Sequence, residues 1–178
     1  MWTKYCRTLE LVNAPMDALD LPRPDPEGAG AHGDTAIAIS ELRFSWAGAN
    51  KTLLDIETLF VRKAERVFLF GPSGSGKSTL LSLIGGLLVP QSGMVRILDR
   101  DIAAMDGAAR DRFRADHIGF IFQMFNLIPY LSVVENVCLP CGFSARRRER
   151  ARKAGTSVRA EAVRLLEHLG LGSAQLLR

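Results

Sequence analysis

The sequence lacks any long uninterrupted apolar run. Its longest apolar stretch, residues 80–89, contains Ser82 and two glycines and ends at Pro90, so it is too short and too interrupted to cross a bilayer. The first residues carry Glu10 and Asp17 and have no apolar segment of the kind found in secretory signals. We therefore expect a cytoplasmic chain with no membrane span.

Cysteine is also scarce. Three cysteines among 178 residues are too few and too irregularly spaced for a disulfide framework, as expected in a reducing compartment. Cys138 and Cys141 form a single CxxC pattern, but no second pair and no nearby histidine accompany it. We interpret both as small apolar side chains rather than as a metal or redox site.

Positive charge is concentrated in one place. The net charge is +4, yet residues 146–153 alone contain six cationic side chains and one anionic side chain. No aromatic residue is interleaved with them, so bases would have no stacking platform. This pattern favours a solvated helix face or loop over a nucleic-acid site.

The chain begins with a segment of different composition. Residues 1–35 contain several prolines and a Gly/Ala-rich stretch with little periodicity, which predicts a flexible leader. Apolar residues then alternate over 37–46 and over 54–61, the period of half-buried strands. We expect these strands to be antiparallel.

The following segments predict alternating strands and helices. Val67–Phe70 is a continuous apolar run ended by Gly71, as expected of a strand covered on both faces. A helix is expected over 78–88, and strands over 95–98 and 118–122. Apolar residues between Val158 and Leu169 recur at helical spacing, and Gly170 is placed to end that helix.

The clearest motif lies directly after the buried strand. Residues 71–79 read GPSGSGKST and match the phosphate-binding pattern G-x-x-x-x-G-K-[ST] at a junction between strand and helix. The glycines allow the backbone to wrap closely round a phosphate, and the start of the helix adds its positive dipole end. Lys77 is expected to reach the β- and γ-phosphates, and Ser78 to offer its hydroxyl to Mg²⁺. The expected nucleotide contacts are Gly71, Ser73, Gly74, Ser75, Gly76, Lys77, Ser78 and Thr79.

Longer stretches of sequence resemble one family. Residues 71–81, followed by GGL at 85–87 and PQSG at 90–93, closely resemble the ATP-binding cassette (ABC) transporter family. The segment IGFIFQMFNLIP, residues 118–129, resembles that family's Q-loop. The resemblance extends over about residues 37–178, and within the family it is most similar to cassettes that serve lipoprotein release and macrolide export.

The resemblance implies a fold and a division of the chain. The implied fold class is α/β, a P-loop NTPase fold of ABC type with an antiparallel β subdomain, a parallel-sheet core and a helical subdomain. The ATP-binding core would cover residues 36–135, and the start of the helical subdomain residues 136–178. We expect the fold to be incomplete at its C-terminal side.

The resemblance also implies roles for two further residues. The family's Q-loop glutamine contacts Mg²⁺ and the attacking water and communicates with the membrane domain, a role that falls on Gln123. Trp46 ends the first strand where the family usually places a tyrosine that stacks on adenine, and an indole suits that role. A core position for Trp46 stays open, and Phe44 on the same alternating face is a competing candidate.

Several elements that the family places after Gln123 are absent before Arg178. They are the signature motif, a strand ending in a metal-binding Asp and a catalytic Glu, and a switch histidine. His117 and His168 stand in other contexts, and Asp99 has the sequence context of a turn. Because the strand with the Asp lies beside the strand that leads into the phosphate loop, we expect an unpaired edge, exposed apolar faces and an unstable isolated chain.

The functional expectation is an ATPase subunit. It would bind ATP and Mg²⁺, pair head to tail with a second cassette and drive a transmembrane transporter subunit from the inner face of the membrane. Two alternatives stay open. One is a small nucleotide kinase with residues 146–153 as its lid, and the other is a non-catalytic regulatory or decoy subunit that docks on a membrane partner near Gln123.

Overall fold

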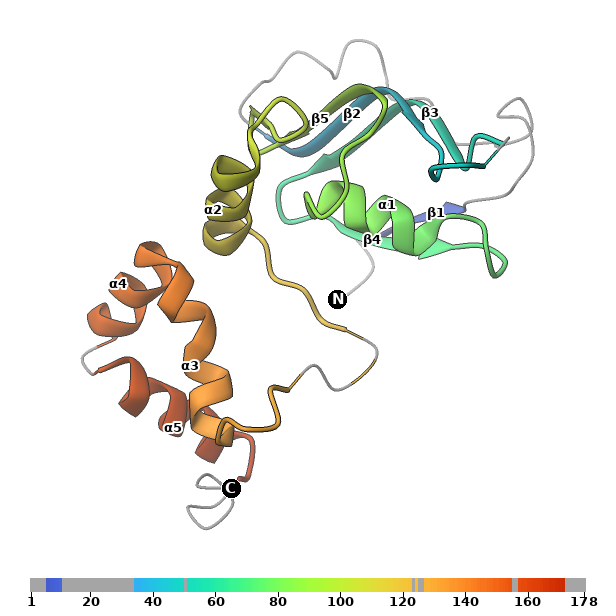
Figure 1. Cartoon of the computed structure of the whole chain (residues 1–178). Coiled ribbons are helices and arrows are strands. Elements are labelled where there is room, and N and C mark those ends of the chain that lie inside the picture. Colours follow the sequence, from blue (N-terminus) through green and yellow to red (C-terminus); the bar gives the residue numbers. More distant parts are fainter. Residues whose placement is uncertain are drawn as a thin grey trace. The chain divides into compact units, whose positions relative to one another are not determined.

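The computed structural model describes residues 6–10, 34–49, 51–122, 124, 127–154 and 157–171, and the chain divides into two compact units. Residues 1–106 form the first unit, which holds every described strand together with helix α1, and residues 107–178 form the second (Figure 1). The boundary between these units falls at 106/107, earlier in the chain than the subdomain division at 135/136 that the resemblance implies. Helix α2 (Gly107–His117) already contacts helices α3 and α4 of the second unit.

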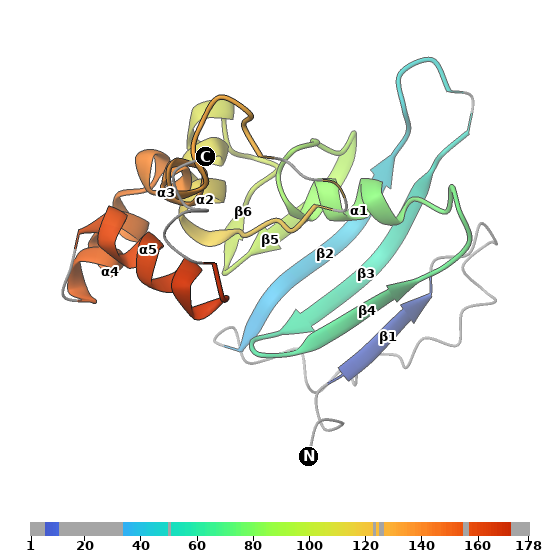
Figure 2. The same ribbon diagram turned by 90° about the horizontal axis from the view of Figure 1, so that it is seen from below.

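A four-stranded antiparallel sheet dominates the first unit (Figure 2), in the order β3-β2-β5-β6. Its strands are β2 (Thr35–Phe44), β3 (Leu54–Arg62), β5 (Ser92–Ile97) and β6 (Arg100–Asp101). Ile39, Leu42 and Val95 of this sheet are completely buried. The antiparallel strands expected from the alternation are confirmed.

The central strand of this sheet contains an irregularity. The pairing of β2 with β5 shifts register between Ser40 and Arg43, and Glu41 has a φ of 53°. Gly93 faces this irregularity with a φ of 92°. A Cβ placed on Gly93 would lie 2.5 Å from the carbonyl carbon of Glu41 and 2.6 Å from Cα of Leu42. Only glycine therefore allows the two backbones to approach so closely.

Strand β4 (Arg66–Phe70) leads into the phosphate loop, residues 71–79. Its pairing and its exposure both differ from what the sequence predicted. It pairs in parallel with β1 (Cys6–Glu10), so the expectation of a flexible leader over residues 1–35 is wrong for these five residues. Residues 1–5 and 11–33 lie outside the described part. Coverage of β4 on both faces is also wrong, because Phe68 and Phe70 are 59% and 52% exposed.

Helix α1 (Lys77–Ile84) follows the phosphate loop and is shorter than the expected span of 78–88. It ends at a glycine pair, of which Gly86 has a φ of 68°. A left-handed residue at this place stops the helical hydrogen-bond pattern. The helix buries Leu80 and Leu83, and it contacts β5.

The second unit consists of helices in its described part: α2, α3 (Val133–Phe143), α4 (Ala145–Lys153) and α5 (Val158–His168). Val134, Ala162 and Leu166 form its core. Helix α5 ends as predicted, because Gly170 has a φ of 82° and its N–H donates to Glu167 O while that of Leu171 donates to Leu166 O. The expected strand over 118–122 is wrong. These residues are irregular, and no described strand pairs with them. None of the helices in the described ranges has the length and apolar character needed to span a bilayer.

Candidate nucleotide-binding site

The phosphate loop runs from the end of β4 to the start of α1. Gly74 and Gly76 have φ values of 80° and 93°, and Gly76 is the N-cap residue of α1. No side chain of the described part caps the helix. The first N–H groups of α1 are thus available to an anion, which the dipole of the helix also favours.

Lys77 lies folded over this loop. Its Nζ donates hydrogen bonds to Gly71 O at 2.8 Å and to Pro72 O at 2.6 Å, and it lies 3.4 Å from Ser75 Oγ. The ammonium is therefore held by oxygen atoms of the loop itself. Because it is already positioned, less conformational freedom of this side chain is lost when a phosphate binds.

The remaining loop residues differ in exposure. Ser75, Gly76 and Thr79 are buried, whereas Ser73, Gly74 and Ser78 are exposed. A Cβ on Gly76 would lie 2.7 Å from Cδ2 of Leu54, the buried first residue of β3. The side chain of Leu54 in the antiparallel sheet thus packs against the loop at Gly76. The exposed Ser78 presents its hydroxyl on the first turn of α1.

The structure separates the two aromatic candidates for a base platform. Phe44 is 5% exposed and belongs to the core, whereas Trp46 is 51% exposed. Their rings meet edge to face, with centroids 5.2 Å apart and an interplanar angle of 86°. Phe44 therefore supports the indole, and Trp46 alone of the pair offers an open ring surface.

One residue that sequence analysis missed fixes the backbone beside Trp46. The side-chain amide of Gln91 accepts from Ser45 N at 2.9 Å and donates to Ser45 O at 2.5 Å. Its own backbone N–H donates to Arg43 O at 3.2 Å. Gln91 and Ser45 are far apart in the sequence, so no local pattern predicted the hydrogen bonds between them.

Gln123 lies outside the described residues, and its role therefore stays a prediction. The residues just before it include Phe120 and Phe122, whose rings stack with centroids 5.8 Å apart. Further along the chain, the side chain of Asn136 stabilises the turn that leads into α3 by hydrogen bonds. The Asn136 Oδ1 accepts from Ile128 N at 2.8 Å, and Nδ2 donates to three carbonyl oxygens at 3.0–3.1 Å.

A capping box begins helix α3 at Ser132 and Glu135. Hydrogen bonds from the Ser132 hydroxyl and backbone N–H lower the pKa of the Glu135 carboxyl below its ordinary value of 4.5. Ionised Glu135 stabilises this helix end, and the contribution is lost as the pH falls through that lowered pKa. The pattern S-x-x-E before an apolar run was the available signal in the sequence.

Two arginines of the basic run have structural partners rather than solvent alone. Arg147 donates from Nε to Ala115 O at 2.7 Å and from Nη2 to Ile118 O at 2.8 Å, at the end of α2. Arg148 donates to Cys141 O at 2.7 Å and Gly142 O at 2.9 Å, near the end of α3. Both guanidinium groups donate hydrogen bonds to carbonyl oxygens near helix C-termini, where a positive charge is favourable. The expectation of a solvated helix face therefore holds for only part of residues 146–153.

The cysteine pair lies within α3, away from any group of ligands. Cys138 is half-buried against the core of the second unit, and burial raises the pKa of its thiol. A raised pKa leaves less of the reactive thiolate at neutral pH. The described ranges contain no group of three or more His, Cys, Asp or Glu side chains suited to a metal ion.

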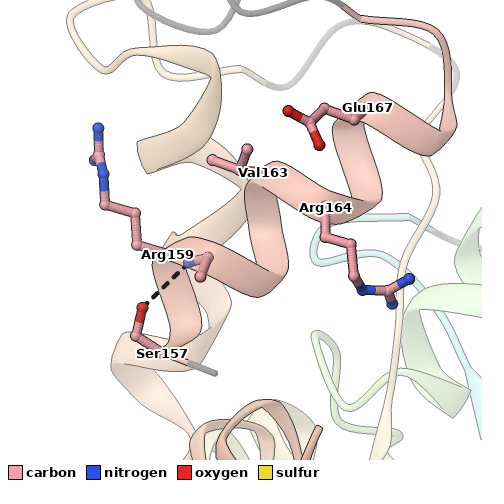
Figure 3. A pocket seen from close by; sticks show the side chains of 6 residues that line it. Ser157, Arg159, Val163, Arg164 and Glu167 are labelled. Carbon is pink, nitrogen blue, oxygen red and sulfur yellow. Dashed lines mark hydrogen bonds between the residues drawn. The ribbon is translucent and has the colours of Figure 1, made fainter. Parts of the chain in front are cut away.

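A shallow cavity lies along α5 (Figure 3), lined by residues between Ser157 and Glu167. Ser157 Oγ accepts from Ala160 N at 3.2 Å and so caps the helix. Arg159 and Arg164 extend to opposite sides, and Arg164 pairs with Glu161 at 2.7 Å. Since every wall comes from one helix, the side chains do not converge on a common point.

The sequence comparisons identify a protein family. Residues 54–177 match the profile of the family described as ABC transporter. The lipoprotein-releasing system ATP-binding protein LolD of Chromohalobacter salexigens is 43% identical over 110 residues, which are 62% of this chain and 46% of LolD. The phosphonates import ATP-binding protein PhnC of Nitratidesulfovibrio vulgaris is 37% identical over 148 residues, which are 83% of this chain and 55% of PhnC.

A solved structure shares the fold. The ATP-binding cassette MJ0796, determined as a dimer in a post-hydrolysis state with ADP and Pi, superposes with a TM-score of 0.66 at 32% identity. The match covers 80% of this chain and 60% of that one. The chain thus spans about half the length of the two curated relatives above.

Proposed function

Because the chain belongs to the ABC transporter family, we propose that it binds Mg·ATP at residues 71–79 and supplies this part of the site to a transporter ATPase. The observation that carries the proposal is the position of Lys77, whose ammonium is held by loop oxygens at 2.6–3.4 Å at the N-terminus of a helix. The solved relative with ADP and Pi supports nucleotide as the ligand class.

The loop residues divide the task of binding. Backbone N–H groups of residues 73–79 surround the phosphates, Lys77 balances the charge of the β- and γ-phosphates, and buried Thr79 supports the α- or β-phosphate. Mg²⁺ fits this site, since it binds through one or two protein oxygens plus phosphates and water, and exposed Ser78 offers such an oxygen. The ion would neutralise phosphate charge, and by resemblance Gln123 would be its second protein contact.

The partners and location follow from the family. We propose that the intact protein pairs with a second cassette, as MJ0796 does in its dimeric structure, and drives a membrane subunit from the cytoplasmic face. The two relatives are named for lipoprotein release and for phosphonate import. What they share is the powering of transport rather than one cargo.

The nucleotide-kinase alternative receives less support. Its lid would need several arginines directed at a second phosphate substrate. In the second unit, Arg147 and Arg148 instead hydrogen-bond to backbone carbonyls. The basic run therefore has a structural use that requires no second substrate.

Binding of Mg·ATP by the purified chain is the direct test. We expect saturable binding by calorimetry, weakened at least about tenfold when EDTA removes Mg²⁺, because the phosphate charge is then balanced by Lys77 alone. Circular dichroism first establishes that the chain is folded. A folded chain without measurable affinity for any magnesium nucleotide contradicts the proposed function.

Trp46 is expected to provide the platform for the adenine ring. Replacing Trp46 with alanine should weaken ATP binding about tenfold, the equivalent of one stacked base, whereas Trp46→Tyr should change it less than about threefold. Free triphosphate, which has no base, serves as the control ligand and should bind both variants equally. A loss of affinity for triphosphate in Trp46→Ala would instead indicate damage to the loop.

A further inference from the structure

The pairing between β2 and β5 ends just before Trp46. Its last pair is Arg43 opposite Ser92, and Figure 2 shows the two strands side by side. Continuing the same antiparallel register by two residues would place Ser45 opposite Pro90. Proline has no N–H, so the backbone at Pro90 cannot donate a hydrogen bond to Ser45. Ordinary strand pairing therefore cannot fix the backbone directly beside Trp46.

The side chain of Gln91 supplies the pairing that Pro90 cannot. Its amide oxygen accepts from Ser45 N at 2.9 Å, and its amide nitrogen donates to Ser45 O at 2.5 Å. The carboxamide thus offers both the acceptor and the donor that a facing residue of a strand would offer. Gln91 is itself held in place, because its backbone N–H donates to Arg43 O at 3.2 Å.

Ser45 lies between the two aromatic residues of this strand end. The buried ring of Phe44 packs edge to face against the exposed ring of Trp46. Phe44 also lies opposite Leu54 in the pairing of β2 with β3, and the Leu54 side chain packs against Gly76 of the phosphate loop. The indole and the phosphate loop are therefore connected through neighbouring residues of one sheet, and the backbone at Ser45 sets where the indole lies.

We propose that Gln91 is a positioning residue for base recognition, which holds the backbone at Ser45 so that the Trp46 indole stays where it stacks on adenine. The inference rests on the proposed function, in which Trp46 is the base platform and residues 71–79 bind the phosphates. A platform that is already fixed loses less conformational freedom when a base stacks on it. Gln91 therefore increases the affinity for the base and leaves the affinity of the loop for phosphates unchanged.

The ratio of the affinity for Mg·ATP to the affinity for magnesium triphosphate measures base recognition. By calorimetry, Gln91→Ala should lower this ratio about three- to fivefold, less than the effect of about tenfold expected when the whole platform is removed. Gln91→Glu keeps the length and the acceptor but has no N–H for Ser45 O, and it should lower the ratio to a similar extent. The triphosphate reference cancels the effect of its added charge. Ser92→Ala, at the exposed next position, is the control and should change the ratio by less than about twofold.

A double-mutant cycle distinguishes positioning from a general effect on the fold. In a Trp46→Ala background, Gln91→Ala should change the ratio by less than about twofold, because no platform remains to be positioned. A second measurement needs no nucleotide. In a Trp2→Phe background, the time-resolved fluorescence anisotropy of Trp46 should show faster local motion of the indole in Gln91→Ala than in the parent.

The possible outcomes separate this inference from the proposed function. If the parent binds Mg·ATP and both Gln91 variants keep its affinity ratio, the positioning role is overturned while the proposed function stands. A loss of the ratio that is equally large when residue 46 is already alanine also overturns the role, as do equal losses of affinity for Mg·ATP and for triphosphate. If the folded parent binds neither ligand, the proposed function fails, and this inference fails with it.

Discussion

Replacing Lys77 with alanine is expected to weaken Mg·ATP binding at least about 30-fold, which corresponds to about 2 kcal/mol. The reason is that the substitution removes the one cation held within the loop. Its Nζ lies 2.8 Å from Gly71 O and 2.6 Å from Pro72 O, at the N-terminus of α1. Charge-assisted hydrogen bonds to phosphate are among the stronger polar contacts in proteins. Isothermal titration calorimetry at constant ionic strength gives the affinity.

Lys63→Ala is the matched control for this experiment. Lys63 is exposed and precedes β4, so it lies at the opposite end of that strand from the loop. An exposed charge at that distance should change the affinity by less than about twofold at physiological salt. Equal losses in the two variants would indicate a general effect of charge, and undiminished binding by Lys77→Ala would refute the assigned loop chemistry. A thermal melt without nucleotide shows whether either variant alters the fold.

Replacing Gly93 with alanine is expected to destabilise the first unit by about 3 kcal/mol. Part of the cost is the left-handed backbone, with φ at 92°, which disfavours a Cβ by about 1–2 kcal/mol. The rest is overlap of that Cβ with backbone atoms of Glu41 and Leu42 at 2.5 and 2.6 Å, since overpacking typically costs about 1–3 kcal/mol. Backbone atoms have no alternative rotamer, so the two strands must move apart. Urea denaturation, followed by Trp46 fluorescence in a Trp2→Phe background, measures the change.

Gly48 allows the two costs to be separated. It has a similar φ of 80°, but a Cβ there would have no atom within 4 Å. Gly48→Ala should therefore show only the backbone cost, about 1 kcal/mol. If both substitutions destabilise the unit equally, the close approach of β5 to the irregularity in β2 is not what requires glycine at position 93.

The sequence closely predicted β2 and β3 of the antiparallel sheet and the ends of α5. Alternation over 37–46 and 54–61 corresponds to β2 and β3, and Gly170 ends α5 with the expected hydrogen bonds. These features depend on residues within a few positions of one another. Local periodicity and backbone preference are therefore sufficient to predict them.

Predictions that depended on which segments lie side by side in space were less accurate. The residues of 118–122 are apolar enough for a strand, yet they form none in the absence of a described pairing partner. One edge of β4 is paired by residues 6–10, which come from the segment assigned to a flexible leader. Phe68 and Phe70, expected in a strand covered on both faces, are exposed on one side. Each of these outcomes depends on what lies beside a segment in space.

The sequence by itself determined the loop between β4 and α1, because its glycines, its lysine and its hydroxyls stand in nine consecutive residues and the order of strand, loop and helix is local. Only the tertiary structure decided that Phe44 is buried while Trp46 is open, that Gln91 fastens the backbone beside it, and that residues 6–10 pair with β4. The physical reason is that burial and pairing are properties of contacts between distant segments. No short window of sequence contains both partners.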